Sequence, residues 1–564
     1  MHGSATDVAE LPGSGGVAHR TPVDLRSGRV RAAQVAAPLL AAVLLAAWLI
    51  VDPRTPDLAA QVYRAELFRQ LGFAVWDEHW YAGHHLPGYS LLFGPVTWLL
   101  GVRLTGVVAV LASTLLFGRL VRRAYGEAAG WGAALFALAA VGDVWAGRVT
   151  FALGVALALA ACVALQDGHP LWAAPVAALC AAASPVAGAL LALAALTLAV
   201  YERSPRALVV LAAPAAIVVV ALALVFPEGG WEPYPLTSFA ATVLVVALFW
   251  LALPRGERLL RTGAALYLLA CVACVAIHTP LGSNIERYAV LLAAPLLLCA
   301  RLAAAEASEA AGTAAAVRGR LRDAALAPLA LAALCAALVW TVWGPVRETL
   351  AVAGSPATSA AYYAPLERFL AGAARGPLRV EVPLTRSHWE AALLAPRFSL
   401  ARGWEKQLDE RYDRPLLAAG LDAASYLRWL RRAAVTYVAL PDAALDPSSA
   451  REGRLIDGGL PFLVPVWSNA HWRVYRVLAP TPLLSGPGHL TALGHDSFAL
   501  HADSAGRFVV RVRFTRYWTL ARGHGCVRPA PGGWTGLTLT QPGDAVVAAS
   551  FSLARVFATG GSCG

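Results

Sequence analysis

The stretch PRTPDLAAQVYRAELFRQLGFAVWDEHWYAGHHLPGYS, residues 53–90, is the longest polar interruption in the first 300 residues of the chain. It follows the first apolar run, and it gathers acidic and histidine side chains in a sequence that is otherwise poor in charge. Ionisable groups beside apolar spans are costly to place, which makes them candidates for function. This stretch therefore indicates where the chemistry of the chain is concentrated.

The composition predicts a polytopic membrane protein. Of 564 residues, 58% are hydrophobic and only 14% are charged, with a mean hydropathy of +0.58. A soluble domain carries about 25% charged residues. The net charge of +11 does not indicate nucleic-acid binding, because the arginines lie beside apolar runs instead of forming one basic face.

Apolar runs that could cross a bilayer as helices recur along the first two thirds of the chain. We expect about 11 of them, at 34–51, 104–120, 127–142, 149–165, 171–184, 186–201, 207–226, 237–253, 262–278, 288–304 and 325–343. No cleavable signal peptide is expected, because residues 1–33 are polar and no cleavage site follows the first run.

Arginines fall in alternate loops, and such loops face the cytoplasm. They are Arg26, Arg29 and Arg31, then Arg119, Arg122 and Arg123, then Arg203 and Arg206, then Arg255, Arg258 and Arg261, then Arg301, Arg318, Arg320 and Arg322. We therefore expect a multi-pass protein of the cytoplasmic membrane with a cytoplasmic N-terminus and an extracytoplasmic C-terminal region.

The predicted domains follow from these patterns. Residues 1–33 form a disordered cytoplasmic segment, and 34–344 form the transmembrane domain, with an outer loop at 53–103. Residues 345–455 mix helical and strand patterns and predict an α/β portion. Residues 456–564 alternate with a period of two between Gly and Pro turns and predict a β-sandwich. Cys526 and Cys563 in this polar region predict a disulfide, which suits an oxidising compartment.

Within the outer loop, DLAAQVYRAELFRQLG has helical spacing and predicts an amphipathic helix in the membrane interface. Residues 88–101, GYSLLFGPVTWLLG, predict a re-entrant or interfacial helix. Asp57 stands at the start of the first of these helices. A carboxylate at the membrane boundary suits a general base that deprotonates an acceptor hydroxyl. The alternative is that Asp57 caps the helix.

This arrangement resembles the GT-C superfamily of membrane glycosyltransferases, whose donors are polyprenyl-phosphate sugars. Pro56-Asp57-Leu58 followed by Val62-Tyr63 is similar to the D-L-x-V-Y pattern of bacterial polyprenyl-phosphomannose-dependent mannosyltransferases, with two extra residues between Leu58 and Val62. The resemblance covers 34–343 as architecture and extends to mannosyl- and arabinosyltransferase-like enzymes. It implies a catalytic role for Asp57. Tyr63, in the same segment, is a candidate for binding the substrate.

Two further groups are candidates. Asp77 and Glu78 form a second acidic pair for catalysis, and the neighbouring Trp80, His84 and His85 are candidates for binding sugar. No cofactor is expected; the alternative is a divalent metal held by Asp77 with His79, His84 and His85, although their spacing matches no zinc pattern.

Two arginines on the outer side run against the cytoplasmic bias of the other arginines. Arg287, in SNIERYAV, and Arg148, in GDVWAGRVT, are candidates for binding the phosphate of the donor.

The sequence therefore predicts a glycosyltransferase that moves a hexose or pentose from a polyprenyl-phosphate donor to a cell-envelope glycan or glycolipid on the outer face. No Walker A loop or Gly-rich dinucleotide motif is present, which disfavours an ATP-driven or nucleotide-sugar enzyme. The alternatives are a transporter or flippase of lipid-linked saccharides, and a non-catalytic membrane protein that binds envelope polysaccharide.

Overall fold

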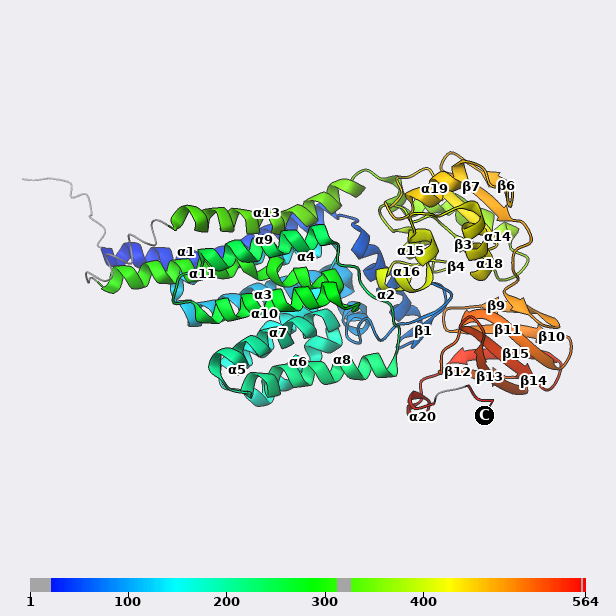
Figure 1. Cartoon of the computed structure of the whole chain (residues 1–564), viewed down its shortest axis with the longest axis horizontal. Coiled ribbons are helices and arrows are strands. Elements are labelled where there is room, and N and C mark those ends of the chain that lie inside the picture. Colours follow the sequence, from blue (N-terminus) through cyan, green and yellow to red (C-terminus); the bar gives the residue numbers. More distant parts are fainter. Residues whose placement is uncertain (1–21, 312–325, 559–560, 564) are drawn as a thin grey trace, which may run out of the picture.

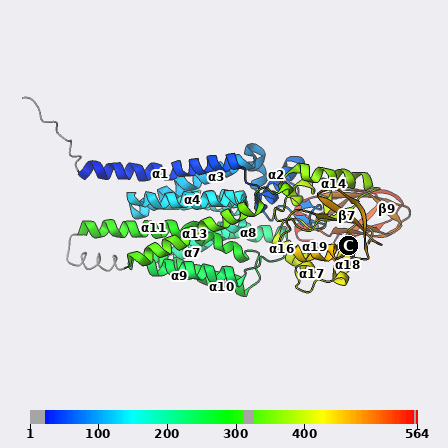
Figure 2. The ribbon, with the colours of Figure 1, turned by 90° about the horizontal axis from the view of Figure 1, so that it is seen from above.

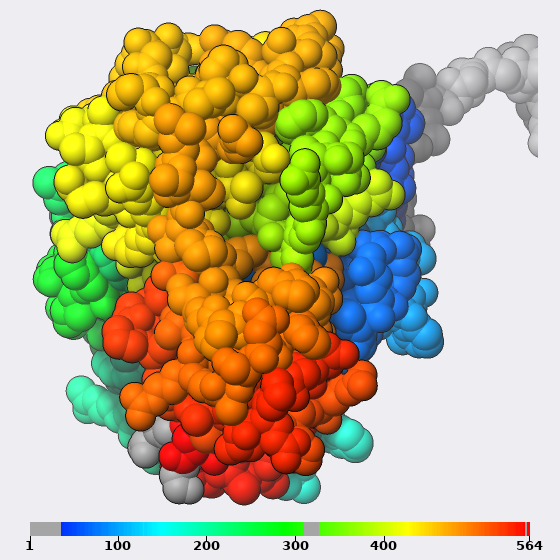
Figure 3. Space-filling model, turned by 90° about the vertical axis from the view of Figure 1, so that its right-hand side faces the viewer, coloured from blue at the N-terminus to red at the C-terminus, as the bar shows by residue number. Residues whose placement is uncertain are grey.

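A computed structural model of the chain describes residues 22–311, 326–558 and 561–563. Apolar helices form one elongated bundle, and an α/β portion and a β-sandwich lie together at one end of it (Figure 1, Figure 2). Seen from that end, the α/β portion lies above the sandwich, with part of the N-terminal chain exposed beside them (Figure 3).

Each expected span coincides with one apolar helix of the bundle. These helices are α1 (Pro22–Val51), α3 (Phe93–Tyr125), α4 (Gly130–Trp145), α5 (Val149–Gln166), α6 (Pro170–Ala183), α7 (Pro185–Glu202), α8 (Ala213–Val225, preceded by a π-helical turn at Leu208–Ala212), α9 (Leu236–Ala252), α10 (Arg258–Ala276), α11 (Glu286–Ala311) and α13 (Ala327–Val352).

Length and composition make the chain a multi-pass membrane protein. Seven helices are long and apolar enough to cross a membrane, namely α3, α5, α7, α8 with its preceding turn, α10, α11 and α13. The helices α4, α6 and α9 are apolar but shorter, and α1 forms a bent pair with the next helix, which would make an eighth span.

The first helices differ from expectation in two places. The helix α1 already begins at Pro22, so only residues 1–21 of the expected disordered segment lie outside the described residues, as do Arg318, Arg320 and Arg322. Residues 93–101 of the expected interfacial run and the following span form one element, α3, which breaks at Gly101. There φ is 73°, a value that glycine adopts without a steric penalty.

The helix α2 (Pro56–Leu71) turns away from α1 by 80° and is enclosed by protein. Leu58, Tyr63 and Leu67 pack in one core with Trp80 from the outer loop and Tyr363 from the α/β portion. The apolar side of the helix is therefore covered by protein of the C-terminal region instead of lipid. A place of α2 in the membrane interface stays a prediction.

The α/β portion is built on a five-stranded sheet with the order β4-β3-β5-β7-β6. Its strands are β3 (Arg379–Glu381), β4 (Ser399–Leu400), β5 (Tyr437–Pro441), β6 (Leu463–Ser468) and β7 (Trp472–Val477). Its helices are α14 (Ala360–Ala373), α15 (Glu390–Leu393), α16 (Lys406–Tyr412), α17 (Arg414–Leu417), α18 (Ala423–Arg432) and α19 (Ala450–Asp457).

The boundary between the two C-terminal portions lies later in the chain than expected. The strand β7 pairs antiparallel with both β5 and β6, so the α/β portion continues to Val477 instead of ending at 455. The alternating pattern identified WRVYRVL as a strand but did not reveal its partners.

The C-terminal portion is a β-sandwich of two antiparallel four-stranded sheets, β12-β15-β10-β9 and β13-β14-β11-β8. Phe498 and Val547 from the first sheet meet Phe508 and Leu537 from the second in one core. The strands are β8 (Leu484–Ser485), β9 (Gly488–Leu493), β10 (Ser497–Ala502), β11 (Gly506–Arg513), β12 (Trp518–Arg522), β13 (Gly525–Ala530), β14 (Trp534–Leu539) and β15 (Gly543–Ala549), followed by a helical turn, α20 (Leu553–Val556).

Candidate functional site

Asp57 lies in the first turn of α2, at the end of the bundle that faces the C-terminal region. The residue at the N-cap position is Thr55, so Asp57 is not the cap and that alternative is not supported. A carboxylate in the first turn is nevertheless stabilised by the helix dipole. The side chain keeps 33% of its surface exposed, which leaves it accessible to a substrate.

Arg148 holds the Asp57 carboxylate from one side. It lies in the turn between α4 and α5, and its Nε donates to Asp57 Oδ2 at 3.1 Å. The two remaining nitrogens face other acids, with Nη2 3.4 Å from Glu348 Oε1 and Nη1 3.8 Å from Asp143 Oδ1. All three guanidinium nitrogens thus face carboxylates, so Arg148 positions Asp57 and is poorly placed to bind a phosphate as well.

A glycine allows this turn to approach α2. Gly147 has a φ of 88°, and a Cβ built there would lie 2.3 Å from the backbone nitrogen of Leu58. A side chain at this position would therefore push the turn away from the start of α2. The close approach places Arg148 within hydrogen-bond distance of Asp57.

Two further cations lie near Asp57 without a direct partner. Arg287 is the second residue of α11, with its guanidinium 5.1 Å from the centroid of the Phe151 ring. Lys406 is the first residue of α16 and is exposed. Within the described part of the chain, neither side chain forms a hydrogen bond or ion pair, although both act electrostatically on the Asp57 carboxylate. We call Asp57, Arg148, Asp143, Glu348, Arg287 and Lys406 the Asp57 cluster.

Sequence reasoning did not identify Glu348 or Lys406 as members of this cluster. Lys406 is the only lysine in the chain, and that rarity was the available signal. Glu348 lies near the end of α13, far from Asp57 in sequence. A third residue that was missed, Glu232, accepts a hydrogen bond from Ser283 Oγ at 3.1 Å and interacts electrostatically with Lys406 and Asp57.

Asp77, the second catalytic candidate, lies in a closed site. Its side chain is 0% exposed. It accepts hydrogen bonds from the Tyr63 hydroxyl at 2.8 Å, from the His79 backbone at 3.1 Å and from His495 of the β-sandwich at 2.8 Å. The His84 ring lies 3.8 Å from its second oxygen. We call Asp77, Tyr63, His79, His84 and His495 the Asp77 cluster.

The charges of the Asp77 cluster are compensated internally. Burial acts to raise the pKa of Asp77, but the hydrogen bond from His495 and the neighbouring histidines lower it to about 2. Burial lowers the pKa of His79 to about 4, with a further contribution from His495. The hydrogen bond to Asp77 outweighs burial and raises the pKa of His495. An ionised Asp77 with a protonated His495 is thus the stable pair.

Glu78 is also buried, and it joins the outer loop to the α/β portion. Its carboxylate accepts hydrogen bonds from the Arg379 guanidinium and from Ser399 Oγ. Burial raises its pKa to about 7. Because neither Asp77 nor Glu78 is accessible, the structure argues against the catalytic roles that the sequence suggested for them.

Most of the predicted sugar-binding residues belong to this buried junction and not to the surroundings of Asp57. Tyr63 stacks on Trp80 with ring centroids 4.5 Å apart, and Trp80 stacks on His84. His85 is held by Glu228 at 2.8 Å and by Thr515 at 3.0 Å. Of the predicted substrate-binding residues, the structure brings only Arg287 and Arg148 to Asp57.

The predicted metal alternative has no support from the geometry. Among residues 22–311, 326–558 and 561–563, no three His, Cys, Asp or Glu side chains are grouped so that they could hold a metal ion. The rings of the outer-loop histidines instead form hydrogen bonds with protein groups: His79 with the Ala395 carbonyl, His84 with the Asp77 carbonyl and His85 with the Thr515 hydroxyl.

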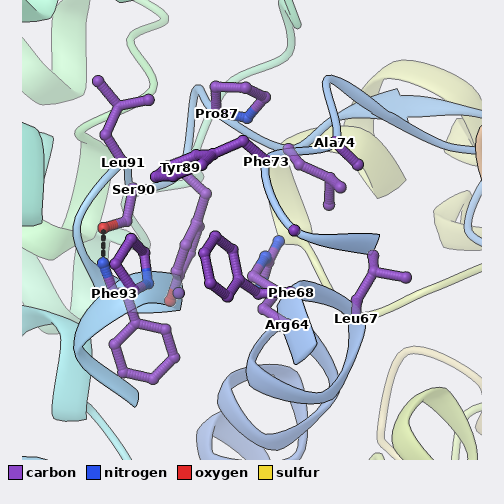
Figure 4. Close-up of a pocket in the computed structure, with 14 residues that line it drawn as sticks. Arg64, Leu67, Phe68, Phe73, Ala74, Pro87, Tyr89, Ser90, Leu91 and Phe93 are labelled. Carbon is purple, nitrogen blue, oxygen red and sulfur yellow. Dashed lines mark hydrogen bonds between the residues drawn. The ribbon is translucent and has the colours of Figure 1, made fainter. Parts of the chain in front are cut away.

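A cavity opens on another side of α2, between this helix and residues 86–95 (Figure 4). Its lining is mostly apolar and includes Phe68, Phe73, Leu91 and Phe93. Arg64 lies at its inner end, where its guanidinium is 3.8 Å from the centroid of the Tyr89 ring. The same guanidinium forms an ion pair of 2.7 Å with Glu405, the neighbour of Lys406. The cavity and the Asp57 cluster thus share the helix α2.

Comparisons with known proteins leave the family open. No protein-family model matches the chain, and no curated protein matches it. Among solved structures it is similar to ArnT from Cupriavidus metallidurans in the apo state, at 14% sequence identity, with a TM-score of 0.39 over 78% of this chain and 97% of that chain. A likeness this distant carries no argument about activity, which has to be argued from the residues of this chain.

Proposed function

We propose that this chain is a GT-C-like membrane glycosyltransferase that transfers a sugar from a polyprenyl-phosphate donor to a cell-envelope acceptor. One observation carries the proposal. A half-buried, accessible carboxylate at the end of the bundle is held by one arginine and flanked by two cations that form no ion pair within the described part of the chain. A base and an anion-binding pair side by side are what transfer from a lipid phosphate requires.

In the proposed reaction, an acceptor hydroxyl attacks the anomeric carbon of the donor sugar. Asp57 takes the hydroxyl proton while the bond between that carbon and the phosphate oxygen breaks. The electron pair of this bond leaves with the polyprenyl phosphate, which gains one negative charge. Arg287 and Lys406 stabilise that charge, because their positive groups are not neutralised by direct protein partners.

Arg148 acts as a positioning residue in this scheme. Its hydrogen bond fixes one oxygen of Asp57 and favours the ionised carboxylate, the form that accepts a proton. The second oxygen remains for the acceptor hydroxyl. The apolar cavity beside α2 supports the same assignment, since it offers a place for part of a lipid chain near the cluster.

We place this site on the outer face of the cytoplasmic membrane. The arginine distribution supports a cytoplasmic N-terminus, and the Cys526–Cys563 disulfide, with a Cα–Cα distance of 5.0 Å, supports an oxidising compartment for the sandwich. A lipid-linked donor suits a compartment that has no nucleotide sugars.

The test is transfer by the purified full-length protein in liposomes. Radiolabelled polyprenyl-phosphate hexoses, pentoses and amino sugars are offered one at a time with an extract of envelope lipids and glycans. We expect one donor class to give labelled product, and Asp57→Asn to lower the rate by about 100- to 10,000-fold, the range of general-base catalysis.

The matched control is Asp52→Asn, five residues away. Asp52 is 46% exposed and pairs with Arg103, and asparagine tolerates its positive φ of 46°. This variant is expected to retain the wild-type rate. Absence of transfer from every donor by correctly folded wild type, or full activity of Asp57→Asn, would reject the proposal.

A further inference from the structure

The C-terminal segment of the β-sandwich carries an apolar surface that neither the bundle nor the sandwich covers. Phe551, Leu553 and Phe557 are 48%, 73% and 85% exposed. Leu553 and Phe557 are four residues apart across the turn α20, so they lie on one side of it, while Val556 packs against the sandwich core. Such a surface on a membrane protein requires a partner.

The position of this segment indicates what that partner is. The Phe551 ring lies 5.9 Å from Phe226, the residue that directly follows the spanning helix α8. Tyr517 stacks near Phe551 at 5.7 Å and donates a hydrogen bond of 2.6 Å to the carbonyl of Val225. The segment therefore lies at the level where α8 leaves the bilayer, as Figure 1 shows for α20 beside the end of α8.

The span beside this segment is itself apolar on its outside. Ile217, Val220 and Leu224 of α8 are 67%, 55% and 66% exposed, as expected for a lipid-facing helix. Following α8 to its end leads to Phe226, a buried residue whose ring lies 5.9 Å from that of Phe551. The exposed apolar side chains of the span and those of the C-terminal segment thus lie on the two sides of one aromatic contact.

Two arginines beside the turn fit the same partner. The Arg555 guanidinium donates to the carbonyls of Arg516 and Trp518, and the Arg516 guanidinium donates to the carbonyl of Val556. Within the described chain neither guanidinium forms an ion pair with a carboxylate. Both positive charges therefore remain to attract anionic lipid headgroups.

A disulfide ties the segment back to the sandwich. Beyond the turn, Cys563 is bonded to Cys526 on β13, and Ser562 Oγ accepts a hydrogen bond from the Val527 backbone at 3.0 Å. Gly561 crosses so close to this strand that a Cβ there would lie 1.8 Å from the Val527 carbonyl oxygen. The apolar turn is thus presented by a closed loop and is not a loose chain end.

We propose that residues 551–557 are an interfacial membrane anchor that inserts Leu553 and Phe557 into the outer leaflet beside α8. Aromatic and aliphatic side chains flanked by arginine are the usual composition of interfacial anchors. The anchor fixes the β-sandwich against the bilayer, in addition to its contacts with the outer loop. This inference does not depend on the proposed transferase activity.

The test measures the depth of position 557 directly. The full-length protein carries a fluorescent non-canonical amino acid at 557 and is placed, one copy per nanodisc, in phosphatidylethanolamine with phosphatidylglycerol. The control carries the same label at 466, where Val466 is 39% exposed on β6 of the α/β portion. We expect lipids with a shallow nitroxide to quench position 557 at least three-fold more than position 466, and aqueous iodide to quench in the opposite order.

Quenching of position 557 by iodide as strong as at 466, without quenching by the nitroxide lipid, would overturn the anchor. Shielding of 557 from both quenchers would also overturn it, because protein would then cover the surface. In a second arm, Leu553→Glu is expected to reduce lipid quenching at 557 by at least half, whereas Val466→Glu leaves it unchanged. An unchanged signal in Leu553→Glu would count against insertion of this turn.

Discussion

The two polar clusters of the 53–90 stretch differ in their balance of charge and in access. The Asp77 cluster is closed, since its carboxylate is fully buried and has partners from three parts of the chain. The Asp57 cluster is open, and two of its cations form no hydrogen bond or ion pair with the residues that the structure describes. The comparison teaches that acidic residues in one loop are not equivalent. The compensated cluster joins the outer loop to the C-terminal region, whereas the accessible one leaves positive charges for which we propose a ligand.

The strongest challenge to this comparison is Asp77→Asn. Removing one member of a buried charge pair costs about 3–5 kcal/mol, so we expect a clearly lower unfolding temperature and faster proteolysis between the two C-terminal portions. Activity per folded molecule should change little. Scanning fluorimetry and a transfer assay on the same preparation measure both quantities.

Asp544→Asn is the control for this prediction. Asp544 forms a similar pair with His501 on the surface of the same sandwich, at 2.7 Å and largely exposed. Such pairs contribute little to stability, so no measurable change is expected. If Asp77→Asn instead removed activity while the unfolding temperature stayed constant, the roles of the two clusters would have to be exchanged.

The next largest effect is expected from Arg287→Gln, on the binding of the donor. A hydrogen bond to a charged group contributes about 1.5–3 kcal/mol, and loss of it should raise KM for the lipid-phosphate donor by about 10- to 100-fold. Lys406→Gln should act in the same direction by a smaller factor, because Lys406 is more exposed. Stability should change little, since neither side chain forms a hydrogen bond or ion pair within the described residues and Arg287 loses only its contact with the Phe151 ring.

Arg69→Gln serves as the matched control on α2, because Arg69 is 66% exposed and pairs with Glu66. Its KM for the donor should equal that of the wild type. Equal KM values for Arg287→Gln and Arg69→Gln would remove the phosphate-binding role.

The smallest predicted effect is the pH dependence of the stability that the Asp77 cluster contributes to the fold. The pKa of His495 is raised in the folded state, so its contribution to the free energy of unfolding is complete below about pH 6.5. It is lost as pH rises through the raised pKa. We expect His495→Asn to be less stable than the wild type by about 1–3 kcal/mol at pH 6, with a smaller difference at pH 9.

Unfolding temperatures measured from pH 6 to pH 9 check this prediction. The His501→Asn variant, which alters the exposed pair, should show no such trend. The contribution of Asp77 does not interfere, because its pKa of about 2 confines its loss to a range below pH 4. If the stability difference between His495→Asn and the wild type grew with pH, His495 would not be the protonated partner of Asp77.

The sequence predicted best what depends on neighbouring residues. Every expected span coincides with an apolar helix, because an apolar run specifies a helix locally. Of the described helices, seven are long enough to cross a membrane, or eight with the bent pair, so the expected number of about 11 spans was too high. Asp57 and Arg287 were identified because charges next to apolar runs are conspicuous. Lys406 and Glu348 were missed because their proximity to Asp57 depends on tertiary contacts across about 300 residues.

The same distinction explains the interpretation of α2. Its pattern is that of an interfacial helix, but Arg64 is buried at a cost that Glu405 offsets from 341 residues away. The strand β7 was recognised from its alternation, yet its sheet depends on pairing with β5. The periodicity of apolar residues identifies helices and strands, but it does not tell which parts of the chain pack against them.

The enclosure of α2 has a consequence for how the protein is made. This helix leaves the translocation machinery early, but Tyr363, Glu405 and His495, the residues that complete its surroundings, are synthesised only much later. Until then its apolar face and its arginine lack their partners. Enclosure of α2 is therefore completed only after the C-terminal portions are made, and a nascent chain halted before the α/β portion would hold Asp57 on a helix without these partners.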